Sequence, residues 1–172
     1  TKTIYNNPRF GRQLKSSKHF SGDLEAVLIG LNSPNEKISA IFDLVKSKMS
    51  WDGTNSKYPR KEGIDNAYKE GVGNSAEINL TLVAMLREAG INANPILVST
   101  RSHGIPIFPT KSGFNYVIAG VEINNDVILM DATEKYSKPN LLPLRDLNWQ
   151  GRLIRENGSS TSVDLYPKTY NT

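Results

Sequence analysis

Cysteine is absent from the 172 residues of this chain. Without thiols there can be no disulfide, no thiolate-bound metal ion and no cysteine nucleophile. Only two histidines occur, His19 and His103, so we expect no histidine-rich metal site. No apolar run approaches the ~18–20 residues that cross a bilayer, so we expect no membrane span. Nothing in the sequence calls for a metal or another cofactor.

An initiator methionine and a signal peptide are also missing, and we interpret the chain as an excised domain or a processed product. The net charge is +4, with the denser basic stretches at residues 9–18 and 57–61. No aromatic residues alternate with arginine there, so we expect a solvated basic surface and no nucleic-acid partner. A chain of this length and 38% apolar content is expected to form one soluble domain.

Residues 1–20 are polar and without periodicity, and we predict an extended lead-in before a single domain at 21–172. Apolar residues at helical spacing predict a short helix near residues 24–31. The sequence Ser33-Pro34-Asn35-Glu36 is typical of a helix start, and the apolar stripe that follows predicts a helix ending near Trp51. Residues 53–63 are expected to form a surface loop, and residues 64–70 one or two helical turns.

The stretch from Gly71 to Leu80 predicts a glycine-rich turn that leads directly into a helix. Asn74 is expected to cap this helix, and Glu77 to complete the capping box. Apolar residues occupy nearly opposite faces, so the helix is expected to be buried at the centre of the domain. Gly90 is expected to end it. Ser75 falls in the first turn, where free amides and the helix dipole favour a nucleophile or an anion.

From residue 94 the pattern changes to strands. We predict a buried strand at residues 95–100, a hairpin of strands at 114–123 and 127–131, and edge strands at 152–155 and 163–166. Helices followed by an antiparallel sheet constitute an α+β fold.

Several stretches resemble the bacterial transglutaminase-like domains. They are Gly73-Asn74-Ser75-Ala76-Glu77 opening a long helix, Met85-Leu86-Arg87-Glu88-Ala89-Gly90-Ile91 ending it, Pro95-Ile96-Leu97-Val98, Phe114-Asn115-Tyr116-Val117-Ile118 and Leu129-Met130-Asp131-Ala132-Thr133. The resemblance covers roughly residues 35–135. It implies a papain-like α+β fold, in which N-terminal helices and a central buried helix pack on an antiparallel sheet.

The resemblance also implies a Cys-His-Asp triad for acyl transfer or amide hydrolysis, but only part of it is present. Ser75 stands at the cysteine position and Tyr116 at the histidine position, and Asp131 alone retains the family residue. A serine hydroxyl needs a strong neighbouring base. An unperturbed phenol has a pKa of about 10, so it is a poor base at neutral pH. We therefore expect a structural network, in which Tyr116 donates to Asp131 or accepts from Ser75.

Other residues are candidates for catalysis or binding. His103, in the loop after residue 100, is a possible replacement base, and His19 and Glu77 are weaker ones. Trp51 and Arg101 are candidate binding residues, since an indole can line a cleft and a guanidinium pairs with carboxylates. For each of these, packing or ordinary surface pairing is the alternative.

Our leading hypothesis is a non-catalytic transglutaminase-like domain that serves as a binding or scaffolding module in a larger protein. The expected partners are flanking domains and, in the degenerate cleft, a peptide or a glycan. The resemblance suggests a bacterial parent protein that is periplasmic or secreted, although the residues do not fix the location. The alternatives are a serine-based acyl hydrolase that uses Ser75, and a structural spacer without a ligand.

Overall fold

The computed structural model describes residues 11, 14, 19–54, 56–60, 63–98, 116–123, 126–134, 150–155 and 159–164. Within these ranges the chain has four helices followed by a five-stranded sheet, and a pair of two-residue strands lies among the helices. Helix α2 covers Ser21–Leu28, α3 covers Pro34–Lys48, α4 covers Gly63–Glu70 and α5 covers Ser75–Glu88. The α+β class predicted from the order of the patterns is confirmed.

Local capping defines where α3 begins. The Ser33 hydroxyl accepts the amide of Glu36, and Pro34 occupies the first helical position, as predicted. The helix ends at Lys48, earlier than predicted. Ser50–Trp51 then forms strand β1, which pairs in parallel with β2, Val72–Gly73. Two paired residues are too few to show a strand period, so this pairing could not be predicted from the sequence.

Helix α5 is the central element of the fold. Every residue from Ser75 to Leu86 is buried, as the apolar residues on both of its faces predicted. Gly90 follows the helix with a φ of +82°, the left-handed conformation that favours glycine. The amide of Ile91 then bonds to the carbonyl of Leu86 and closes the C-terminal turn.

Five antiparallel strands form the sheet, in the order β5-β4-β3-β6-β7. Their bounds are Ala93–Val98 for β3, Tyr116–Ile123 for β4, Asp126–Met130 for β5, Gln150–Ile154 for β6 and Ser160–Asp164 for β7. The predicted β4–β5 hairpin is present. The prediction that both C-terminal strands are edge strands is wrong for β6, which pairs with β3 on one side and β7 on the other.

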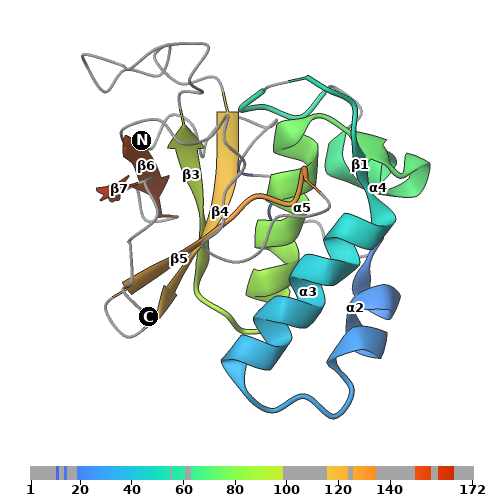
Figure 1. Ribbon diagram of the computed structural model, residues 1–172. Helices are drawn as coiled ribbons and strands as arrows, with labels where there is room; N and C mark the ends of the chain where they lie inside the picture. Colours follow the sequence, from blue (N-terminus) through green and yellow to red (C-terminus); the bar gives the residue numbers. More distant parts are fainter. Residues whose placement is uncertain are drawn as a thin grey trace.

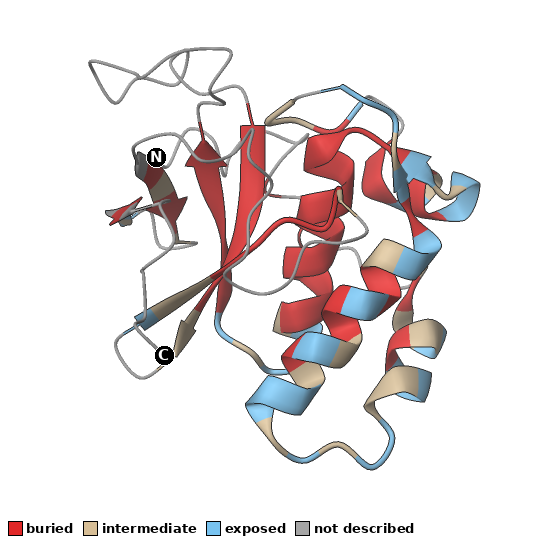
Figure 2. Cartoon of the chain, viewed as in Figure 1, coloured by how far each residue is buried: buried red, intermediate tan, exposed pale blue. Residues whose placement is uncertain are grey.

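The sheet and helices form layers, with α5 between the sheet and the pair α2–α3 (Figure 1). Helix α5 packs against β4 and β3 on one side and against α3 and α4 on the others. Figure 2 shows the burial of α5 and of the central strands, while α3 exposes one face. Leu14 and Phe20, from the predicted lead-in, also lie in the core, at 6% and 1% exposure.

Candidate functional site

The N-terminus of α5 is fixed by a capping box, as predicted. The Asn74 side chain accepts the amide of Glu77 at 2.8 Å, and the Glu77 carboxylate accepts the amide of Asn74 at 2.8 Å. Glu77 is fully buried and also accepts from the Arg60 guanidinium at 3.0 Å. The hydrogen bond from Arg60 to Glu77, and then the charge of that carboxylate, raise the pKa of Arg60. Glu77 is therefore a structural residue of this helix start.

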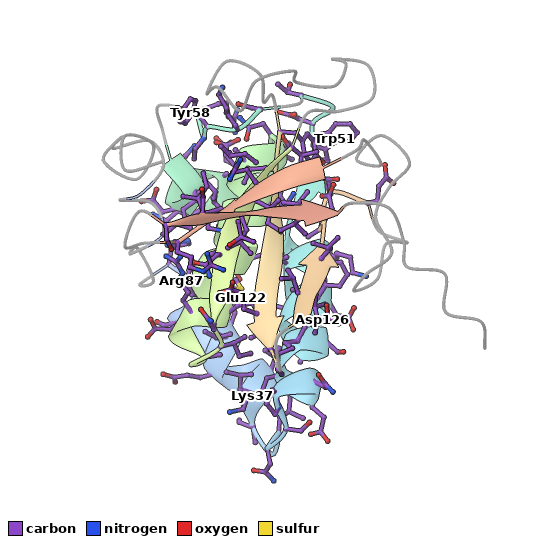
Figure 3. The ribbon with its side chains drawn as sticks, turned by 90° about the vertical axis from the view of Figure 1, so that its left-hand side faces the viewer. Lys37, Trp51, Tyr58, Arg87, Glu122 and Asp126 are labelled. Atoms are coloured by element: carbon purple, nitrogen blue, oxygen red, sulfur yellow. The ribbon has the colours of Figure 1, made fainter. Side chains whose placement is uncertain are left out.

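Strands β1 and β2 place Trp51 beside the start of α5. Trp51 pairs with Gly73, two residues before Ser75. A Cβ at Gly73 would lie 3.0 Å from Cβ of Glu77, a tight approach that favours glycine where β2 passes the helix. The half-buried Trp51 donates its indole N–H to the Thr54 carbonyl at 3.0 Å. Figure 3 shows Trp51 and Tyr58 at the same end of the molecule.

The Ser75 hydroxyl is held by the main chain of a single residue. Its Oγ donates to the Ser56 carbonyl at 2.7 Å and accepts the Ser56 amide, also at 2.7 Å. The amide of Ser75 donates to the Thr54 carbonyl at 3.1 Å. Ser75 has no exposed surface. Neither partner of the hydroxyl is a titratable group, so among the described residues nothing in contact with Oγ can take up its proton.

The tyrosine and aspartate positions lie together. Tyr116 donates its phenolic proton to Oδ2 of Asp131 at 2.7 Å, as the network hypothesis predicted, and its hydroxyl lies 3.0 Å from Oγ1 of Thr133. Both Tyr116 and Asp131 are fully buried. The Tyr116 ring belongs to the apolar cluster that contains Ile118, whereas the next residue along, Val117, belongs to the cluster around α5. Alternation along β4 thus directs the tyrosine away from the helix that carries Ser75.

Asn79 connects this pair to α5, a role that we did not predict from the sequence. Its amide nitrogen donates to Asp131 at 2.9 Å and to the Val117 carbonyl at 2.9 Å, and its Oδ1 accepts the amide of Ala132 at 2.9 Å. The amide of Thr133 donates to Asp131 at 3.0 Å. An amide side chain one helical turn after Ser75, on a helix predicted to be buried, was the available signal.

The three positions matched to the family's triad, Ser75, Tyr116 and Asp131, therefore lie in two separate hydrogen-bonded groups. Tyr116 and Asp131 are directly bonded, and Asn79 ties them to α5. Ser75 bonds instead to Ser56, a residue of the predicted surface loop that we had not singled out. Two of the candidate binding or base residues, Arg101 and His103, lie outside the described residues.

His19 packs away from this region. Its ring contacts Phe20 and Tyr68, with centroids 4.7 and 5.4 Å apart, at edge-on angles. Both ring nitrogens are buried, and neither has a hydrogen-bond partner among the described residues. Burial lowers the pKa of His19; Asp65 opposes this shift and Lys69 adds to it. No contact given for His19 reaches Ser75, so we assign it no part in this site.

The lowered pKa of His19 predicts a pH effect on stability. The unfolded chain protonates this histidine near pH 6.5, above the folded-state pKa, so the unfolded state binds the proton first as the pH falls. The contribution of neutral His19 to the free energy of unfolding is present above pH 6.5 and is lost as the pH falls through the folded-state pKa. We measure the free energy of unfolding in urea at pH 8 and at pH 5. Between these two values it should fall less for His19→Phe than for the wild type. Equal losses would contradict this assignment.

A depression of about 630 Å³ lies at the C-terminal end of α5. Its polar lining forms a continuous chain: Arg87 donates to Asn94 at 2.9 Å, Asn94 to Glu122 at 3.4 Å, and Arg155 pairs with Glu122. Figure 3 shows Arg87 and Glu122 well separated from Trp51 and Tyr58. These side chains join α5 to β3, to β4 and to Arg155, the residue after β6. Because their charges pair with one another, we assign no ligand here.

Within the described ranges, no group of three or more histidine or acidic side chains is placed to hold a metal ion. None of the helices α2 to α5 has the length and apolar content needed to span a bilayer.

Comparison with known proteins gives the family. The model of the transglutaminase-like superfamily matches residues 25–131, more than half of the chain. Nothing among the curated proteins matches.

Three solved structures share the fold. A "putative protease" from Parabacteroides distasonis has a TM-score of 0.64 at 15% identity, over 97% of this chain and 32% of that one. A "putative cysteine protease" from Cytophaga hutchinsonii has a TM-score of 0.50 at 17% identity, over 89% and 52% of the two chains. A structure described as a TGase has a TM-score of 0.52 at 11% identity, over 77% and 34%. The chain thus spans between about a third and half of these proteins, and it belongs to the transglutaminase-like superfamily.

Proposed function

We propose that this domain is non-catalytic and acts as a scaffolding or binding module within a larger, exported bacterial protein. The observation that carries the proposal is the state of the Ser75 hydroxyl, which is fully buried and bonded on both sides to the main chain of Ser56. A serine nucleophile must lose its proton to a base as it attacks. The carbonyl that accepts this proton here is not such a base.

The tyrosine at the histidine position supports the same conclusion. A histidine in that role accepts a proton from the nucleophile and passes it to the leaving group. Tyr116 instead donates its proton to Asp131, and it packs in the apolar cluster opposite α5. The sequence contains no cysteine that might act in place of Ser75. The catalytic pair of the family is thus replaced by two separate, satisfied hydrogen-bonded groups.

Whether this domain is a scaffold or binds a ligand in a cleft depends on whether the region over Ser75 is open or filled. An open groove with exposed aromatic side chains would favour a binding module, whereas a filled cleft favours a scaffold. Residues 54 and 56 bond directly over Ser75, which has no exposed surface, so the scaffolding role is favoured. The alignments cover only 32–52% of the matching structures, and flanking domains are therefore the proposed partners. Export rests on the family resemblance alone.

Labelling with a fluorophosphonate tests the absence of catalysis. We expect the folded protein to show no adduct by intact-mass measurement, and its hydrolysis of p-nitrophenyl acetate to equal that of Ser75→Ala. The buried hydroxyl without a base is the physical reason. Circular dichroism of each sample verifies that it is folded. An adduct that maps to Ser75 and disappears in Ser75→Ala would instead establish the alternative, a serine-based acyl hydrolase.

A further inference from the structure

Three aromatic rings meet where the residues at the start of α2 contact α4. His19 lies edge-on to Phe20 and to Tyr68, with ring centroids 4.7 and 5.4 Å apart, and Phe20 lies 6.4 Å from Tyr68. Phe20 and Tyr68 are buried, at 1% and 8% exposure. The Tyr68 hydroxyl also donates to the Asp23 carboxylate at 2.6 Å. These four side chains, which we call the α2–α4 contact, join the start of α2 to α4.

The ring nitrogens of His19 have no polar partner in the α2–α4 contact. Both are buried, and neither forms a hydrogen bond or an ion pair within the described ranges. A neutral imidazole leaves one donor and one acceptor unsatisfied here, whereas an imidazolium leaves two donors and a positive charge. The charged form costs more to bury. Protonation of His19 therefore weakens the contact.

The charges around His19 offset this cost only in part. Among the described residues, the charges that act on the ring are those of Asp65 and Lys69, two exposed residues of α4, and α3 contributes none. Asp65 favours the protonated ring and Lys69 disfavours it, but burial has the larger effect and lowers the pKa of His19. Burial, and then the bond to Asp23, raise the pKa of Tyr68, so the phenol keeps its proton in neutral and acidic solution.

Helix α2 is the least deeply packed of the four helices. It has 8 residues, of which Leu24 alone is buried, whereas five residues are buried in α3, four in α4 and twelve in α5. Among the described residues, no side chain caps its first turn. A segment with few buried contacts opens at a lower free-energy cost than the whole fold. Detachment of α2 is therefore the smallest opening that brings the His19 ring into water.

We propose that the α2–α4 contact is an acid-sensitive switch: protonation of His19 favours a form in which residues 19–28 have detached, while α3, α4 and α5 stay packed. In that form the imidazolium is solvated, and the amide of Leu24 is released from the Phe20 carbonyl, to which it bonds at 2.9 Å. The hydrogen bonds of Ser75 lie elsewhere, with residues 54 and 56. The inference thus goes beyond the proposed function and does not depend on it.

Amide hydrogen exchange at pH 7.5 and pH 5, corrected for the intrinsic effect of pH, tests the switch. We expect the protection of the Leu24 amide to fall by about 3- to 30-fold in the wild type, because pH 5 lies about 1.5 pH units below the pKa of a free imidazole. In His19→Phe the protection should stay constant within about twofold. In low urea the Leu24 amide should exchange faster than that of Val83 and respond less to urea, which distinguishes local opening from global unfolding.

Asp65→Asn and Lys69→Gln form a matched pair of exposed α4 variants. Asp65 favours the imidazolium, so its loss lowers the folded-state pKa of His19 further and should enlarge the fall in Leu24 protection, whereas Lys69→Gln should reduce it. The reverse order would overturn the proposal. Equal falls in the wild type and His19→Phe, or a Leu24 amide that follows Val83 at every urea concentration, would also overturn it. Fluorophosphonate labelling of Ser75 would contradict the proposed function alone.

Discussion

Asn79→Ala is expected to lower the free energy of unfolding by about 3–5 kcal/mol, because three hydrogen bonds to buried groups are lost at once. Asn79 has no exposed surface. Its side chain is bonded to the Val117 carbonyl, the Asp131 carboxylate and the Ala132 amide, which belong to β4 and to the residues that follow β5. An alanine leaves each of these buried groups one hydrogen bond short, although the Asp131 carboxylate keeps its bonds from Tyr116 and from the Thr133 amide. Urea denaturation monitored by tryptophan fluorescence measures the effect.

Asn92→Ala provides the control for this experiment. Asn92 is exposed, and its amide donates to the Glu122 carboxylate at 3.2 Å. Because water can replace this bond, the substitution should change the free energy of unfolding by less than about 0.5 kcal/mol. A cost below about 1 kcal/mol for Asn79→Ala would mean that the polar link between α5 and the Tyr116–Asp131 pair is not important for stability.

Glu77→Ala is expected to cost about 2–4 kcal/mol, from the loss of charge-assisted hydrogen bonds in a buried position. The carboxylate accepts the amide of Asn74 and the guanidinium of Arg60, so its removal breaks both the capping box and the attachment of residue 60. The exposed part of Arg60 can regain water, and its guanidinium still lies 3.7 Å from the Glu70 carboxylate, which limits the cost of losing Glu77. Chemical denaturation at pH 7 measures the change.

The first turn of α3 supplies a comparison at the equivalent position. Glu36 also stands three residues after its capping residue, Ser33, but its side chain is exposed, and only its amide is used in the cap. Glu36→Ala should therefore cost less than about 0.5 kcal/mol. Similar costs for the two glutamates would show that burial and the Arg60 contact add nothing to the capping position itself.

Local signals in the sequence predicted much of the helical part of the fold. The Ser33-Pro34 start and the Asn74–Glu77 capping box depend on residues one to three positions apart, and both are present as predicted. The burial of α5 followed from apolar residues on both faces. The hairpin of β4 and β5 followed from two apolar runs separated by a short polar turn. These features need no knowledge of distant segments.

The candidate site depends on contacts between distant parts of the chain, so only fragments of it could be predicted. The Tyr116–Asp131 bond joins residues on one predicted hairpin, and the resemblance pointed to both of them. The bonds from Ser75 to Ser56 and from Asn79 to Asp131 join residues 19 and 52 positions apart. Nothing in a polar loop sequence identifies which of its amides will meet a particular hydroxyl.

The two hydrogen bonds between Ser75 and Ser56 determine what a cysteine at residue 75 could do. Sulfur is a weak donor and a weak acceptor, so a thiol at residue 75 would serve the Ser56 amide and carbonyl less well. Ser75→Cys would therefore weaken the contacts with Ser56. The thiol would still not meet the Tyr116 hydroxyl, because the Tyr116 ring packs in the other apolar cluster. Under the proposed function, a working triad would require coordinated substitutions on α5, β4 and the loop, so no single substitution would create one.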